Sequence, residues 1–70
     1  MRLHPIESEA LEAVGYDSEH RLLQVRFVGG GIYEYSDVDR DIYERLMAAQ
    51  PHPWRELHDE VRRHAFVRVD

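Results

Sequence analysis

Hydrophobic and polar residues alternate most regularly between positions 22 and 36. Residues 22–28 read LLQVRFV and residues 32–36 read IYEYS. This period of two is typical of strands with one buried face. Three glycines at 29–31 lie between the two runs and permit the positive φ angles of a tight connection. The stretch therefore predicts a β-hairpin with a three-residue loop.

The alternation also predicts which side chains share a face of this hairpin. With the glycines as the loop, the expected cross-strand pairs are Val28 with Ile32, Phe27 with Tyr33, Arg26 with Glu34, and Val25 with Tyr35. One face then carries an opposite-charge pair, and the other carries aromatic and β-branched pairs worth roughly 0.2–1 kcal/mol each. We therefore expect Tyr33 and Tyr35 in the core or at its edge.

The segments that flank the hairpin are less regular. Residues 11–16, LEAVGY, fit a helix or a strand, and the turn residues at 17–20 favour a strand. Residues 42–49 predict an amphipathic helix, with the short acids before it as caps. Pro53 suits the first position of a second helix that runs to about His64. The stripe expected to be apolar on this helix is Trp54, Leu57, Val61 and Ala65, and residues 66–69 form either a closing strand or a packed tail.

These elements predict one α+β domain spanning residues 1–70. It is a three-stranded antiparallel β-meander followed by two α-helices packed on one face. A chain this short buries only about 60% of its unfolded surface, so most large apolar side chains are needed for the core.

Composition narrows the class of protein. The chain is 43% hydrophobic and 33% charged, with no cysteine, which excludes disulfides, a thiolate nucleophile and cysteine-ligated zinc. It has no long apolar run and no signal-peptide pattern at its N-terminus, so we expect a cytoplasmic protein with no membrane contact. The net charge of −5 disfavours general attraction to phosphate, but residues 51–70 balance four arginines against four acids.

Spaced residues along the first two thirds of the chain carry a family resemblance. They are VGYD at 14–17, LxVxF at 23–27, GxYxYxxV at 31–38, and IYxxL followed by Ala49 at 42–49. In these positions the chain resembles the KTSC domain, found at the C-terminus of some lysyl-tRNA synthetases and as stand-alone bacterial proteins. The family-motif residues, expected to be structural, are Tyr16, Tyr33, Tyr35, Val38 and Tyr43. Asp39 stands where the family usually has proline, and residues 51–62 keep little of the family pattern.

The resemblance implies RNA as a ligand, through association with a tRNA-charging enzyme. Arginines beside aromatic side chains can meet phosphates while the rings stack unpaired bases. The candidate RNA-binding residues are Arg26, Arg55, His58, Arg62, Arg63 and Arg68. The structural alternative is a solvated helix face, because Arg55 with Asp59 and Asp59 with Arg63 are spaced as i,i+4 ion pairs.

No motif indicates catalysis, a cofactor or a metal. His58 and His64 would point about 120° apart on a helix and do not fit HExxH. The aspartates at 37, 39 and 41 lack the glycine and the bidentate glutamate of an EF-hand. We therefore expect a non-enzymatic binding module without cofactor or metal. Its first candidate partner is RNA, and the alternative is a protein partner or a homodimer formed through an edge strand.

Overall fold

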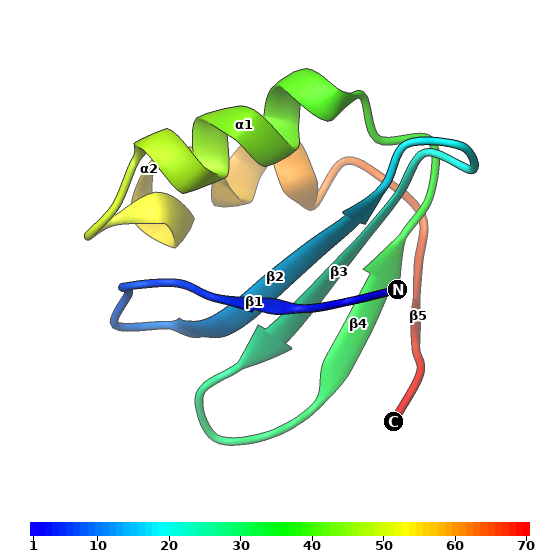
Figure 1. Ribbon diagram of the computed structural model, residues 1–70. Coiled ribbons are helices and arrows are strands. Elements are labelled where there is room, and N and C mark those ends of the chain that lie inside the picture. The colour runs from blue at the N-terminus through cyan, green and yellow to red at the C-terminus, as the bar shows by residue number, and fades with distance from the viewer.

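The computed structural model describes residues 1–70 and places two helices on one face of a five-stranded antiparallel sheet (Figure 1). The strands are β1 His4–Pro5, β2 Leu11–Asp17, β3 Leu22–Phe27, β4 Ile32–Tyr35 and β5 Phe66–Arg68. The helices are α1 Arg40–Ala48 and α2 Pro53–Val61. Neighbouring strands follow the chain order, β1-β2-β3-β4-β5. The last strand therefore forms one edge of the sheet, beyond β4.

The α+β class and the two helices are confirmed, but the three-stranded meander is wrong in strand number. One short strand is added at each edge, where His4 pairs with Val14 and Phe66 pairs with Tyr35. These strands have two and three residues, which is too few for a period-two pattern to develop. For residues 66–69, the closing strand is the correct alternative.

The predicted hairpin forms, but its register differs by two residues. The observed pairs are Leu23 with Tyr35, Gln24 with Glu34, Val25 with Tyr33, and Arg26 with Ile32. The Phe27 N–H donates to the Gly31 carbonyl at 3.1 Å, so the loop comprises residues 28–30. A shift of two preserves both faces, and all three glycines still have φ near +100° (96°, 111° and 96°). The expected Arg26–Glu34 pair is wrong, because Glu34 instead accepts a 2.8 Å hydrogen bond from Gln24.

Strand β2 contains an irregularity that explains its ambiguous sequence. The register shifts between Leu11, which pairs with Phe27, and Ala13, which pairs with Arg26. The extra residue of such a bulge breaks the alternation, so Leu11 and Val14 are both buried although they are three residues apart. That spacing is also the spacing of one helix face.

The N-cap of α1 and the end of α2 differ from the sequence-based expectation. Asp39 occupies the N-cap position of α1 but makes no capping hydrogen bond, because its carboxylate accepts one from Arg21 at 2.6 Å. Pro53 begins α2 as expected, and the helix ends at Val61, before the expected His64. Ala65 is consequently exposed and lies outside the apolar stripe.

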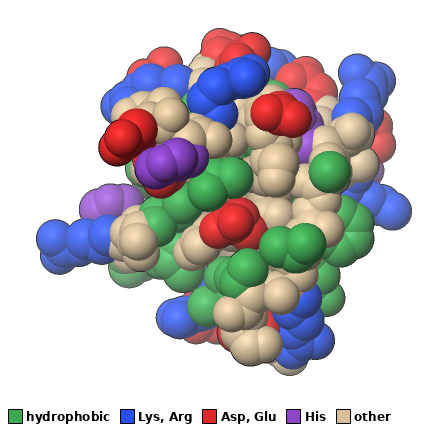
Figure 2. Space-filling model, turned by 90° about the vertical axis from the view of Figure 1, so that its right-hand side faces the viewer, with side chains coloured by type: hydrophobic (Ala, Val, Ile, Leu, Met, Phe, Trp, Pro, Cys, Tyr) green, Lys and Arg blue, Asp and Glu red, His purple; other side chains and the backbone are tan.

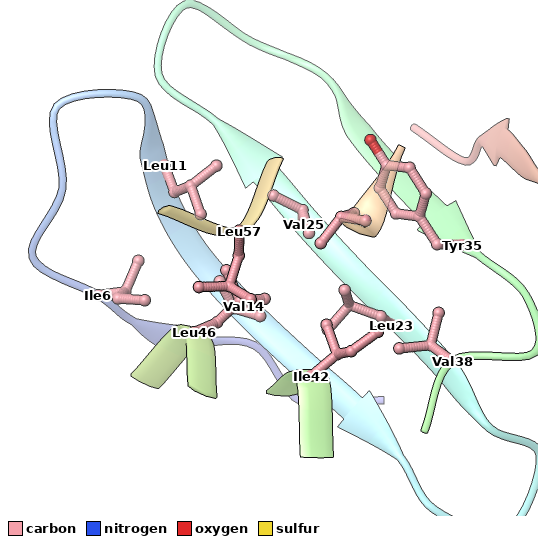
Figure 3. Packing of buried hydrophobic residues seen from close by; sticks show 11 residues of the cluster. Ile6, Leu11, Val14, Leu23, Val25, Tyr35, Val38, Ile42, Leu46 and Leu57 are labelled. Carbon is pink, nitrogen blue, oxygen red and sulfur yellow. The ribbon is translucent and has the colours of Figure 1, made fainter. Parts of the chain in front are cut away.

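The core lies between the helices and the sheet (Figure 3). Its buried members are Ile6, Leu11, Val14, Leu23, Val25, Tyr35, Val38, Ile42, Leu46, Leu57 and Val61. Tyr35 is 5% exposed and lies at the β4 side of this cluster. Arg45 of α1 joins the helices on the outside, since its two terminal nitrogens each donate to Glu60 of α2 at 2.7 Å.

Candidate functional site

An open pocket of about 510 Å³ lies on the helix-bearing side of the sheet, between α2 and strands β3 to β5. We call it the aromatic pocket, and it is lined by Phe27, Gly30, Tyr33, Tyr35, Trp54, Arg62 and Phe66. Its volume is within the range of small-molecule sites. Of its seven lining residues, five are aromatic, one is a cation, one is a glycine, and none carries a carboxylate.

The strand register builds the floor of this pocket. Side chains that are paired across an antiparallel sheet project from the same face, so Tyr35 and Phe66 lie side by side on β4 and β5. Their ring centroids are 5.6 Å apart, and Phe66 is also 5.7 Å from Tyr33. Phe27 of β3 completes the row, with its ring edge-on to Tyr33 at 5.5 Å.

Helix α2 supplies the opposite wall. Trp54 is its second residue and meets Phe27 edge to face, with ring centroids 5.1 Å apart. Arg62 follows the last residue of the same helix and lines the pocket beside Tyr35. Because α2 is one short rigid element, its two ends hold an aromatic ring and a cation at separate points of the rim.

The Tyr35 side chain is part of the hydrophobic core and also lines the aromatic pocket. Burial raises the pKa of its phenol, the nearby Tyr33 adds to this, and Arg62 opposes it. The phenol is therefore uncharged at neutral pH. Its hydroxyl forms no hydrogen bond with the protein. No buried side-chain nitrogen or oxygen lacks a partner, so this hydroxyl atom is not fully buried. In Figure 3 this hydroxyl points away from Leu23 and Val38, so it is free to bond a ligand in the pocket.

The arginines divide into paired and unpaired sets. Four form ion pairs within the chain, namely Arg21, Arg40, Arg45 and Arg68. The unpaired ones are Arg2, Arg26, Arg55, Arg62 and Arg63, of which the last three lie on α2 or directly after it. The sequence suggested that Asp59 pairs with the arginines at i±4. Instead, its carboxylate lies 3.2 Å from the His58 ring.

The structure brings some of the candidate RNA-binding residues together and separates others. Arg62 lines the aromatic pocket, and the Arg68 guanidinium lies 5.9 Å from the Tyr33 ring centre. Arg26 alternates with Val25 and projects from the face of the sheet opposite the helices. Arg63 is exposed beyond the end of α2. Only part of the candidate set therefore shares one surface.

The two remaining RNA-binding candidates, His58 and Arg55, lie on α2 and contact different groups. His58 uses Nδ1 to donate to the Trp54 carbonyl at 2.9 Å, which holds its ring against that helix. Arg55 lies with Trp54 at a second, smaller hollow that also includes Glu9. Arg55 consequently shares this hollow with the Glu9 carboxylate.

The motif residues Tyr16, Val38 and Tyr43 lie away from the aromatic pocket. The Tyr16 and Tyr43 rings stack at 5.7 Å, with 16° between their planes. Sequence reasoning did not list Phe27, Trp54 and Phe66 as site residues. Two features of the sequence could have indicated them. Phe27 is expected on the same hairpin face as Tyr33 and Tyr35, and Trp54, the single tryptophan, lies beside a helix start.

No three histidine, aspartate or glutamate side chains are arranged to hold a metal ion. Neither helix has the length and hydropathy needed to cross a membrane.

Comparisons with known proteins agree with the sequence resemblance. The pattern of the KTSC domain matches residues 7–64, so the match extends through α2. A protein of Tsukamurella paurometabola is 42% identical over 48 residues, covering 69% of this chain and 72% of that protein. An uncharacterized protein of Stutzerimonas stutzeri is 33% identical over 49 residues, covering 70% of this chain and 69% of its own length.

A solved structure supports the fold. The crystal structure of a KTSC domain protein from Yersinia pestis superimposes with a TM-score of 0.90, covering 99% of this chain and 97% of that one. The two sequences are 21% identical, so the likeness concerns the fold.

Proposed function

The chain belongs to the KTSC domain family, and from this premise we propose that it binds single-stranded nucleic acid, with an unpaired base in the aromatic pocket. The observation that carries the proposal is the composition of this pocket. Five aromatic rings and Arg62 line it without any carboxylate. A nucleotide combines a flat apolar base with a negative phosphate, and this lining offers a partner for each part.

The base is expected to stack on the outer rings of the pocket. Phe66 is 56% exposed and Tyr33 is half-buried, so both present ring surface that the protein itself does not cover. Stacking of a base on an aromatic side chain is worth about 1–3 kcal/mol and tolerates any base. The free hydroxyl of Tyr35 adds one donor or acceptor for a base edge.

The phosphates are expected along the arginines near α2. Arg62 has no carboxylate partner in the chain and lies at the pocket rim, so its charge is available to a ligand. Arg63 is the next unpaired cation along the chain and is exposed. Because the net charge of the protein is −5, attraction must be local to this rim and must weaken as salt rises.

Trp54 provides the test, because it is the single tryptophan of the chain and lines the pocket. Titration with a short uridine-rich RNA at low salt should quench its fluorescence. A duplex of the same sequence should quench it much less, because its bases are already stacked. The apparent affinity should fall as salt rises.

A pair of matched arginine variants separates this site from general charge effects. Arg62→Gln should weaken binding and reduce the salt slope by about 1, as expected for the loss of one phosphate contact. Arg26→Gln removes an equally unpaired arginine on the opposite face of the sheet and should leave binding unchanged. Equal effects of the two variants, or no quenching by RNA at any concentration, would refute the proposed site.

A further inference from the structure

The outer edge of β5 presents unpaired backbone groups. On its inner side, the Ser36 N–H donates to the Ala65 carbonyl at 2.9 Å and the Val69 N–H donates to the Ile32 carbonyl at 2.8 Å. Backbone groups of successive residues in a strand point to alternate sides. The N–H and C=O groups of Phe66 and Arg68 therefore point outward, where the sheet has no further strand.

The same edge is apolar. Phe66, Val67 and Val69 are 56%, 58% and 45% exposed. Figure 2 looks onto the side of the molecule where β5 lies in Figure 1. The middle of this face shows hydrophobic side chains among tan atoms, with red acidic colour between them. The blue arginine side chains lie mainly around the periphery. Exposed apolar strand edges of this kind serve as templates for pairing with another strand.

We propose that a second copy of this chain is the occupant, and that two β5 strands pair antiparallel to join both sheets into one. The strand is complementary to itself when the two-fold axis passes between the two Val67 residues. Phe66 of each copy then exchanges backbone hydrogen bonds with Arg68 of the other, which satisfies the outward groups of both residues. The two valines face each other on the side of the sheet away from the helices.

Charge disfavours the neighbouring register that has its axis at Arg68. If the axis passed at Arg68, the two Arg68 side chains would lie directly opposite each other, and such like-charge pairs are destabilising. In the Val67 register, Arg68 instead lies opposite the Phe66 ring of the second copy. A guanidinium near an aromatic ring is attractive, and Arg68 already lies 5.9 Å from the Tyr33 ring of its own chain.

The ends of the paired segments are also complementary. Continuing the register by two residues brings Asp70, which already pairs with Arg68 of its own chain at 2.9 Å, toward His64 of the second copy. His64 uses Nδ1 to donate to the Ser36 carbonyl at 3.1 Å, so only in the doubly protonated ring is Nε2 a second donor for this carboxylate. The short strand limits the buried area, so we expect a weak dimer.

Pairing would extend the aromatic pocket. Phe66 is both an edge residue and a pocket wall, so the second copy would place its Arg68 beside that wall. The two pockets would open on the same helix-bearing face of the joined sheet. The dimer itself rests on the strand edge alone and stands or falls independently of nucleic-acid binding.

Single cysteines test the register, because the chain has none of its own. Facing residues of a non-hydrogen-bonded antiparallel pair have Cα atoms about 4.5 Å apart, within the range of a disulfide. Val67→Cys should therefore form a disulfide-linked dimer under mild oxidation. Val28→Cys is the matched control, since Val28 is 56% exposed but lies in the β3–β4 loop. The Val67→Cys dimer should form at least about tenfold faster, through the high effective concentration of paired strands.

A second cysteine checks the predicted axis. Val69 is also exposed on this edge but would face Ala65 of the other copy, so Val69→Cys should cross-link more slowly than Val67→Cys. Sedimentation of the unmodified chain should show association between roughly 10 µM and 1 mM, the regime of a small interface. Val67→Lys should abolish this association and Val28→Lys should preserve it. A monomer throughout, with equal cross-linking at positions 67 and 28, would overturn the proposal even if RNA binds.

Discussion

The Tyr16 hydroxyl donates a hydrogen bond to the backbone carbonyl of Val38 at 2.5 Å. This bond ties the end of β2 to the segment that leads into α1, 22 residues further along the chain. Val38 is fully buried, and the Tyr43 ring of α1 stacks on Tyr16. Three residues of the family motif thus form one structural contact between the sheet and the first helix.

Loss of this hydrogen bond should destabilise the protein measurably. Tyr16→Phe retains the stacked ring but leaves the Val38 carbonyl without its donor, so the free energy of unfolding should fall by about 1–2 kcal/mol. Urea denaturation at constant m value would measure the change. Tyr43→Phe is the control, because the structure pairs the Tyr43 hydroxyl with no protein group. Equal losses for the two variants would contradict the role of the hydrogen bond.

The sequence predicted which side chains share a face of the sheet better than it predicted which residues pair across neighbouring strands. Alternation fixes which side chains share a face, and the β3–β4 hairpin has the expected faces although its pairs are shifted by two. The loop is where information was lacking, because Gly29, Gly30 and Gly31 all accept positive φ and allow more than one closure. The bulge after Leu11 and the short edge strands were hidden for a related reason. Each depends on backbone pairing with a neighbour rather than on a local pattern.

The candidate site was only partly accessible from the sequence. Arg62 and Arg68 were proposed from residue type, and the structure places both near aromatic rings. Phe66 was expected in a closing strand or a tail, and Trp54 was expected in the helix stripe. They line one pocket because β5 returns to pair with β4, 31 or more residues away, while α2 crosses the same end of the sheet. Such a meeting of distant segments has no signal in either segment alone.

Gly15 has a specific steric role beneath the N-terminal segment. A Cβ atom at this position would lie 2.5 Å from the Arg2 carbonyl oxygen and 2.8 Å from the Leu3 side chain. Gly15→Ala should therefore displace the N-terminal segment and cost about 1–3 kcal/mol, as overpacked sites do. Amide hydrogen exchange at His4 would report the loss of β1. Deletion of residues 1–3 should remove most of the loss in free energy of unfolding that Gly15→Ala causes. An unchanged loss would refute this explanation.

The ion pair between Arg45 and Glu60 should make stability depend on pH. The Arg45 guanidinium lowers the pKa of Glu60 below its usual value of 4.5, mainly through hydrogen bonding. A carboxyl whose pKa is lower in the folded state stabilises fully above its unfolded pKa, and this stabilisation is lost as pH falls through the folded pKa. Glu60→Gln should therefore destabilise the protein at neutral pH and have little effect at strongly acidic pH.

Salt and a neighbouring acid provide the controls for this pH dependence. The Arg45 and Glu60 side chains are 46% and 36% exposed, so added salt should shrink the neutral-pH effect of Glu60→Gln. Glu56 is exposed on the same helix and forms no ion pair. Chemical denaturation of Glu56→Gln across the same pH range should show no comparable change. A Glu60→Gln effect that persists unchanged into acid would rule out the ion pair as its cause.

Phe66 offers the sharpest test of base stacking, because its ring is more than half exposed yet lines the aromatic pocket. Phe66→Leu retains an apolar side chain at this edge but removes the flat π surface, so RNA affinity should fall by the 1–3 kcal/mol typical of one stacked base, or about 5- to 150-fold. Phe66→Tyr retains the ring and should bind RNA like the unmodified chain. Quenching of Trp54 measures all three proteins, and unfolding midpoints should agree closely because the site is exposed. If Phe66→Leu binds as tightly as Phe66→Tyr, bases do not stack on this wall of the pocket.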